Sequence, residues 1–187
     1  MSIEVSGTEG YAEKAPSLVK QWQNISFADQ HKPVLHLIPN APSRILDIGA
    51  GVGVDAAAFA AMGHSIVAVE PVDELRCAGM ELHASSQIEW IDDSLPDLAI
   101  VRSRYETFDV VMLTAVWMHL DEKQRCRAMP NVGALLSEGG VLTCLCDTGL
   151  FQRAGACSTF RGKKPFRSRA SRACGPCSIS VPNPFSR

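Results

Sequence analysis

The chain has 187 residues, 46% of them hydrophobic and 20% charged, and a formal net charge of −2 at pH 7. This length and composition indicate one domain large enough to bury a hydrophobic core. Residues 1–10 are polar and lack the basic-then-apolar pattern of a secretory signal. The longest apolar run, residues 110–118, is too short to cross a membrane. We therefore expect a cytoplasmic protein with reduced cysteines and no membrane segment.

Residues 1–40 are expected to form an N-terminal helical region. Apolar residues recur between positions 11 and 37 at helical spacing, which predicts one or two amphipathic helices. Pro33 should open or break the next helix. One interpretation of these helices is that they pack against the edge of a sheet.

The segment 44–53, RILDIGAGVG, predicts a buried strand followed by a tight turn. An apolar run delivers the acid Asp47, and three glycines follow it: Gly49, Gly51 and Gly53. Glycine can adopt positive φ, and a ligand can lie against its bare backbone. An Ala-rich helix over 55–62 should follow at once and present its N-terminal N–H groups to that ligand. In an open α/β sheet such a turn binds an adenosine-containing cofactor.

Four further strands are predicted downstream. Residues 65–70 predict a strand ending at Glu70, where a carboxylate can accept both ribose hydroxyls of adenosine. Residues 87–91 predict the next strand, before the acidic turn Asp92, Asp93, Ser94. Residues 107–116 predict the fourth strand. Residues 135–143 predict a helix end, a Gly-Gly turn and the start of a fifth strand.

The spacing D-x-G-x-G-x-G from Asp47 to Gly53 resembles motif I of the class I S-adenosylmethionine-dependent methyltransferases. The order of the later elements resembles this family over about residues 10–143. The resemblance implies an α/β, Rossmann-like, doubly wound, mostly parallel sheet. It also implies the cofactor S-adenosylmethionine, bound by a core that we place at residues 41–146.

The resemblance assigns the cofactor contacts residue by residue. Asp47 would face the cationic amino-acid end of the cofactor, and Glu70 its ribose. Asp93 is favoured over Asp92 for the adenine amine, because Asp93-Ser94 matches the family's step of an acid and a small residue. Tyr11 would touch the amino-acid end if the N-terminal helices form a lid. The remaining assigned cofactor positions are Gly49, Ala50, Gly51, Gly53, Pro71, Ser94 and Leu113.

Two other functions stay open. A nicotinamide-dependent oxidoreductase would share Glu70, but Asp47 would face a pyrophosphate, and Val54 stands where the dinucleotide fingerprint needs a small residue. The other alternative is a catalytically inactive remnant of a methyltransferase that binds the cofactor or a partner. The three functions would be separated by which cofactor binds and by whether the bound protein turns over an acceptor.

The acceptor is expected to lie beside Thr114, Trp117 and His119, at or after the fourth strand. Methyl transfer depends on alignment of the nucleophile more than on acid–base groups, although His119 could act as a base. Alternatively, Trp117 and His119 only begin and cap the helix that runs to Leu136. The chain has no Asn-Pro-Pro-Tyr-like tetrad and no basic, aromatic patch before residue 150. This favours a small-molecule acceptor over nucleic acid. The sequence identifies neither the acceptor nor the oligomeric state.

The chain changes character near Cys144. Residues 147–187 hold eight Lys and Arg against one acid and are rich in Ser, Pro and Gly, which predicts a disordered basic tail. We expect the last two strands of the family's sheet to be missing. The cysteines of this region fit no zinc-site spacing, so no metal is expected.

The abrupt change suggests the hypothesis of a reading-frame shift near codon 144. Codons permitted for residues 144–171 can be chosen so that another frame encodes a family-like continuation. Such a shift would remove part of the acceptor pocket. Resequencing the coding DNA across this region tests the hypothesis.

Overall fold

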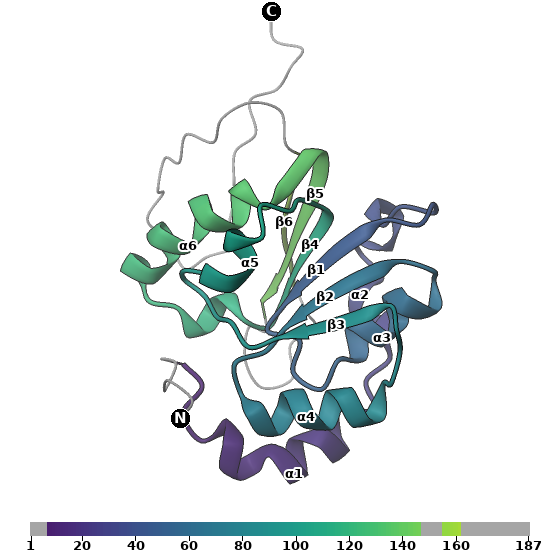
Figure 1. The fold of residues 1–187 in the computed structure, drawn as a ribbon, viewed down its shortest axis with the longest axis vertical. Coiled ribbons are helices and arrows are strands. Elements are labelled where there is room, and N and C mark those ends of the chain that lie inside the picture. Colours follow the sequence, from purple (N-terminus) through teal and green to yellow (C-terminus); the bar gives the residue numbers. More distant parts are fainter. Residues whose placement is uncertain (1–6, 147–154, 162–187) are drawn as a thin grey trace, which may run out of the picture.

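The computed structural model of the protein describes residues 7–146 and 155–161 (Figure 1). Six strands form one sheet in the order β3-β2-β1-β4-β5-β6. These strands are β1 (Arg44–Ile48), β2 (Ser65–Val69), β3 (Ile88–Ile91), β4 (Phe108–Thr114), β5 (Leu136–Cys146) and β6 (Gly155–Arg161). The first five run parallel, and β6 pairs antiparallel with β5. The predicted Rossmann-like, mostly parallel sheet is confirmed.

Strand β6 corrects one prediction. We expected no strand after the fifth, yet β6 lies inside the segment assigned to the tail, so the prediction was wrong for these residues. The sequence GACSTFR carries little strand pattern of its own. Its backbone gains partners from the edge of β5, a tertiary contribution that a local pattern does not contain. The predicted disorder of residues 147–154 and 162–187 falls outside the described residues.

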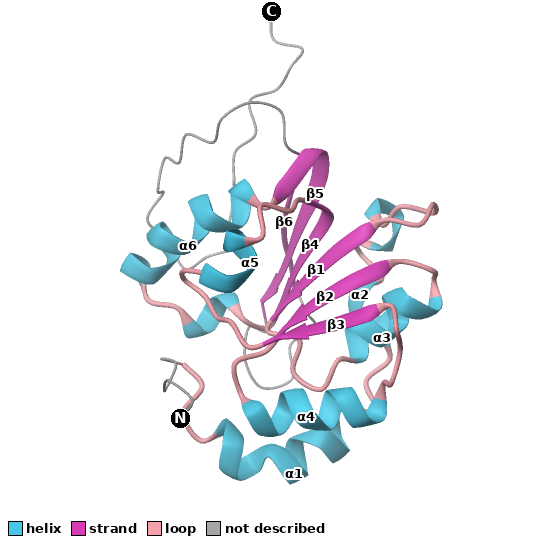
Figure 2. Ribbon diagram, in the orientation of Figure 1, coloured by secondary structure: helices cyan, strands magenta, loops and turns pink. Residues whose placement is uncertain are grey.

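Helices cover both faces of the sheet (Figure 2). Helices α5 (Ala99–Ser103) and α6 (Glu122–Ala134) lie on one face, and α2 (Phe27–His31) and α3 (Val54–Ala61) lie on the other (Figure 1). Helix α1 (Tyr11–Trp22) packs on α4 (Asp73–Leu82), so it covers a helix rather than the sheet edge. Short 3₁₀ turns occupy Leu35–Leu37 and Trp117–His119. None of the helices in the described ranges is long and apolar enough to cross a membrane.

The strands are apolar in consecutive positions because both faces of the sheet are buried. In β1 and β2 every residue after the first is buried. One core cluster joins β4 to α5 and α6 through residues such as Leu113, Val101 and Val132. A second cluster joins the opposite face of the sheet to α2 and α3 through Phe27 and Phe59. The sheet is therefore a rigid base for the loops at its ends.

Residues 135–143 fold differently from the prediction in one detail. Helix α6 ends at Ala134 and β5 begins at Leu136, so the Gly-Gly pair lies within β5. The register between β4 and β5 shifts there, and Gly139 has φ 81°. The predicted turn is thus an irregularity in the strand.

The topology fixes the position of a site. The chain passes from β1 outward to β2 and β3 and then returns to place β4 on the other side of β1. The connections after β1 and β4 therefore diverge at the carboxyl ends of these strands. Ligands of open α/β sheets bind at this kind of switch point.

Candidate active site

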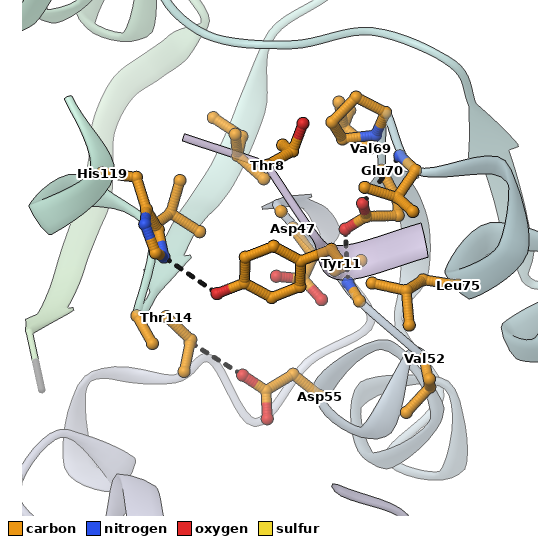
Figure 3. A pocket seen from close by; sticks show the side chains of 18 of the residues that line it. Thr8, Tyr11, Asp47, Val52, Asp55, Val69, Glu70, Leu75, Thr114 and His119 are labelled. Carbon is orange, nitrogen blue, oxygen red and sulfur yellow. Dashed lines mark hydrogen bonds between the residues drawn. The ribbon is translucent and has the colours of Figure 1, made fainter. Parts of the chain in front are cut away.

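A cavity of about 630 Å³ lies at the carboxyl ends of β1, β2 and β4 (Figure 3). Its lining brings together most of the residues that the sequence singled out. These are Tyr11, Asp47, Gly49, Ala50, Gly51, Glu70, Pro71, Asp93, Ser94, Thr114 and His119. Four predicted residues lie outside the lining: Gly53, Asp92, Leu113 and Trp117.

The glycine turn adopts the conformation that its sequence predicts. Gly49, Gly51 and Gly53 have φ 72°, 56° and 79°, in the left-handed region that favours glycine. A Cβ on Gly49 would collide with the side chain of Val116, and one on Gly51 would lie 3.2 Å from the Trp22 ring. Bare backbone is therefore needed at the floor of the cavity.

Gly53 serves the fold rather than the cavity lining. It is the N-cap of α3, and a Cβ there would lie 2.7 Å from the ring of Trp90. Leu113 is likewise withdrawn from the cavity, because its side chain is fully buried in the core beneath β4. Neither residue lines the cavity, so their placement gives no support to their assignment to the cofactor.

Asp47 is a buried acid with an unused acceptor. Its side chain is buried at the end of β1, and Oδ2 has no hydrogen-bond partner among the described residues. Burial raises the pKa of the Asp47 carboxyl well above its ordinary value, and the nearby Asp55 and Glu70 carboxylates raise it further. A positively charged ligand in the cavity would offset both the burial of this carboxylate and its repulsion by the neighbouring carboxylates.

Glu70 holds the loops after β1 and β2 together. Gly51 N–H donates to Oε2 at 2.8 Å, and Val72 N–H donates to Oε1 at 2.9 Å. Burial raises the pKa of the Glu70 carboxyl, and these two hydrogen bonds oppose the shift. Each carboxylate oxygen keeps a further lone pair that a ligand hydroxyl can use.

The acidic turn after β3 separates its two aspartates. Asp93 lines the cavity, and its Oδ2 accepts from Ile100 N–H at 2.8 Å and Val101 N–H at 2.9 Å. Asp92 does not line the cavity: 57% of its side chain is exposed, and it lies 3.5 Å from Arg76. The geometry thus supports the preference for Asp93, while the Asp92 assignment receives no support from its placement.

Sequence reasoning missed a buried network on the opposite wall. Asp55 Oδ2 lies 2.8 Å from His31 Nε2, and the Thr114 hydroxyl donates to the same oxygen at 2.8 Å (Figure 3). His31 is completely buried, and Asp55 lines the cavity. The acid in the first turn of α3 was visible in the sequence, but nothing local indicated that His31 would reach it across 24 positions.

The predicted acceptor residues have three different environments. Thr114 ends β4 in the cavity wall. His119 lines the cavity, with its Nε2 3.2 Å from Tyr11 Oη. Trp117 was predicted to face the acceptor, and the structure corrects this: its side chain is buried in the core cluster with Leu120 and Val132. The 3₁₀ turn also ends before α6, whose own N-cap is Asp121.

The charge of the lining is one-sided. Within the described residues it contains the carboxylates of Asp47, Asp55, Glu70 and Asp93 and has neither Lys nor Arg. No group of three or more potential metal ligands occurs in the part of the chain that the structure describes. The cavity therefore suits a ligand with hydrogen-bond donors or positive charge.

Several solved structures of similar fold are methyltransferases by name. A TehB-like methyltransferase from Corynebacterium glutamicum is 19% identical, with TM-score 0.59 over 76% of this chain and 73% of that one. A 1,6-didemethyltoxoflavin-N1-methyltransferase from Burkholderia thailandensis is 18% identical, with TM-score 0.59 over 78% and 65% of the chains. The N-methyltransferase NodS from Bradyrhizobium japonicum is 17% identical, with TM-score 0.55 over 71% and 72%. At these identities the likeness concerns the fold.

The chain spans from 52% to 73% of the length of such structures. No curated protein sequence matches it. A family model described as a methyltransferase domain matches residues 17–156, which is most of the chain. The protein therefore belongs to the methyltransferase-domain family, which confirms the resemblance to the class I S-adenosylmethionine-dependent methyltransferases.

Proposed function

We propose that the protein transfers a methyl group from S-adenosylmethionine to a small molecule, with both bound in the cavity. The observation that carries this proposal is Asp47, a buried carboxylate whose Oδ2 has no partner in the described structure. A buried acceptor without a donor is costly. The ammonium group of S-adenosylmethionine supplies a donor and the opposite charge at this place.

The other cavity residues fit the rest of the same cofactor. Glu70 can accept from the ribose hydroxyls while it holds Gly51 N–H, and Asp93 can accept from the adenine amine. Gly49 and Gly51 contribute backbone without a side chain to the cavity lining. When bound, the cofactor supplies an electrophilic methyl group on a sulfonium.

The acceptor is proposed to be a small molecule. The cavity volume of about 630 Å³ is in the range of small-molecule sites, and Tyr11 of the N-terminal helix meets His119 in its wall at 3.2 Å. The Burkholderia relative was solved with the small molecule 1,6-didemethyltoxoflavin and S-adenosylhomocysteine. Thr114 and His119 remain the predicted residues nearest the acceptor.

The nicotinamide alternative gains no support from the family match, and the buried Asp47 would repel a pyrophosphate. Calorimetric titration with S-adenosylhomocysteine and with NAD tests the two cofactors directly. We expect S-adenosylhomocysteine alone to bind, and Asp47→Asn to weaken its binding by about tenfold or more, the equivalent of one lost charged hydrogen bond.

The matched control is Asp97→Asn, since Asp97 pairs with Arg127 on the surface and lies outside the cavity. This variant should bind S-adenosylhomocysteine like the wild type. Binding of NAD in place of S-adenosylhomocysteine would contradict the proposal. Binding without methyl transfer to any acceptor would favour the inactive remnant.

A further inference from the structure

Asp55 is a carboxylate whose orientation is fixed from two sides. His31 on α2 and Thr114 at the end of β4 both bond to Oδ2, each at 2.8 Å. Asp55 itself is 7% exposed and sits in the first turn of α3. The three residues therefore join three separate elements at one oxygen atom.

The second oxygen of Asp55 is left for a ligand. No described residue donates a hydrogen bond to Oδ1, although Asp55 lines the cavity. Asp55 Oδ1 is not fully buried, whereas the unpartnered Oδ2 of Asp47 is. The fixed carboxylate thus keeps one unused acceptor on a residue that lines the cavity.

The proposed cofactor does not need this carboxylate. Its ammonium, ribose and adenine already have Asp47, Glu70 and Asp93. Asp55 differs from these acids because it is bonded to Thr114, at the end of the strand beside which the acceptor is expected. The lining of the same cavity also contains apolar Trp22 and Ile25 and the amide of Gln30.

We propose that Asp55 binds the N–H group of a nitrogen-containing acceptor, so that the protein is an N-methyltransferase for a neutral amine or heterocyclic N–H. A carboxylate accepts from N–H, whereas it repels a carboxylate or phosphate acceptor. The described lining contains no Lys or Arg to bind such an anion. This inference rests on the proposed function and names the acceptor class of the same site.

Asp55 also acts as the acceptor for the proton that the nitrogen loses. As the nitrogen lone pair forms the new bond to the methyl carbon, the carbon–sulfur bond breaks and its electron pair stays on sulfur. The N–H proton passes to Oδ1 of Asp55 and then to solvent. His31 and Thr114 are positioning residues, because their bonds to Oδ2 keep Oδ1 directed at the nitrogen.

The test uses the full chain saturated with S-adenosylhomocysteine and calorimetric binding of matched probes. The probes carry an amino, hydroxyl or carboxyl group directly on phenyl or naphthyl skeletons, so that the amines are neutral at pH 7 and the skeletons have no N–H of their own. We expect binding only among the amines. Asp55→Asn should weaken that binding by about tenfold or more and leave the Kd of S-adenosylhomocysteine unchanged. Asp97→Asn should change neither.

Thr114→Val provides a second variant if Asp55→Asn does not fold. It keeps the shape of the side chain, removes one bond to Oδ2 and should weaken amine binding by less than Asp55→Asn. A preference for the hydroxyl or carboxyl probes, no binding of any probe, or unchanged amine binding in these variants would overturn the inference. So would a large loss of S-adenosylhomocysteine binding in Asp55→Asn, because Asp55 would then belong to the cofactor. Failure of the wild type to bind S-adenosylhomocysteine would instead refute the proposed function.

Discussion

Tyr11 Oη lies 3.2 Å from His119 Nε2, although 108 positions separate the two residues in the sequence. Their rings also meet edge to face, with centroids 5.8 Å apart, and the backbone at Gly7 lies close against His119. The start of the N-terminal helix is therefore tied to the segment after β4, on the side of the cavity shown in Figure 3. This contact gives the predicted lid a specific attachment.

Tyr11→Phe should loosen that attachment. The hydrogen bond is exposed, so its loss should cost about 0.5–1 kcal/mol of stability. Burial raises the pKa of the Tyr11 phenol, which keeps the hydroxyl protonated and able to donate. We expect the Kd of S-adenosylhomocysteine to rise by about two- to fivefold in calorimetry.

Tyr105→Phe is the matched control, since that side chain is 95% exposed and lies away from the cavity. It should leave the Kd unchanged. Equal Kd values in the two variants would show that the Tyr11–His119 contact plays no part in binding.

Asp47 should make cofactor affinity depend on pH. Because its pKa is raised, the folded apoprotein keeps this proton at pH values where the unfolded chain, with an ordinary pKa of about 3.9, has lost it. Stability of the apoprotein should therefore fall as pH rises across this window. A cationic ligand prefers the deprotonated form, so its affinity should rise over the same window.

Asp47→Asn removes the buried charge and both pH dependences that it causes. The variant should melt at a higher temperature than the wild-type apoprotein at neutral pH while binding S-adenosylmethionine more weakly. Melts and titrations between pH 5 and 8 measure both effects. A variant that keeps the wild-type pH dependence of affinity would locate the titrating group elsewhere.

Gly49→Ala tests the floor of the cavity. The substitution places a Cβ at φ 72° and into the side chain of Val116. The left-handed conformation alone costs about 1–2 kcal/mol, and the collision adds to it. We expect a destabilised protein that no longer binds S-adenosylhomocysteine.

Gly63→Ala separates the cost of the left-handed backbone conformation from the cost of the collision. Gly63 has φ 90°, but a Cβ there would meet nothing within 4 Å. Chemical denaturation should show a loss of about 1–2 kcal/mol, with cofactor binding retained. If both variants behave alike, close approach at Gly49 is not what the site requires.

Substitutions of Trp117 and Trp22 should have different effects on stability and on cofactor binding. Trp117→Phe removes volume from the core and should cost about 1–3 kcal/mol while the Kd of S-adenosylhomocysteine stays constant. Trp22→Phe alters the ring that lies over Gly51, so it should raise the Kd with little change in stability. If Trp117→Phe alone weakened the binding of S-adenosylhomocysteine, Trp117 would belong to the binding site.

The local patterns predicted the strands, the glycine turn and the acids at the strand ends. The run from Ile45 to Ile48 is buried because both sheet faces are covered, and Gly49 has the positive φ that a tight turn needs. Such features depend on neighbours in sequence. The placement of Asp47 and Glu70 in one cavity then follows from the parallel order of β1 and β2.

Long-range contacts were beyond the reach of these patterns. The pairing of β6 depends on the free edge of β5, and the His31–Asp55 contact depends on how α2 packs against α3. Trp117 follows the fourth strand as predicted, but the direction of its side chain is set by the core that receives it. In each case tertiary packing decided what residue type and spacing could not.

The measurement that tests the central claim most directly is a thermal melt of the full chain with and without S-adenosylmethionine. Ligand at about 100 times its Kd adds roughly 2.7 kcal/mol to the stability of the folded state. For a domain of this size we predict a cooperative melt that rises by roughly 5–10 °C. A cooperative melt that does not move with S-adenosylmethionine would contradict the assignment of the cavity to this cofactor.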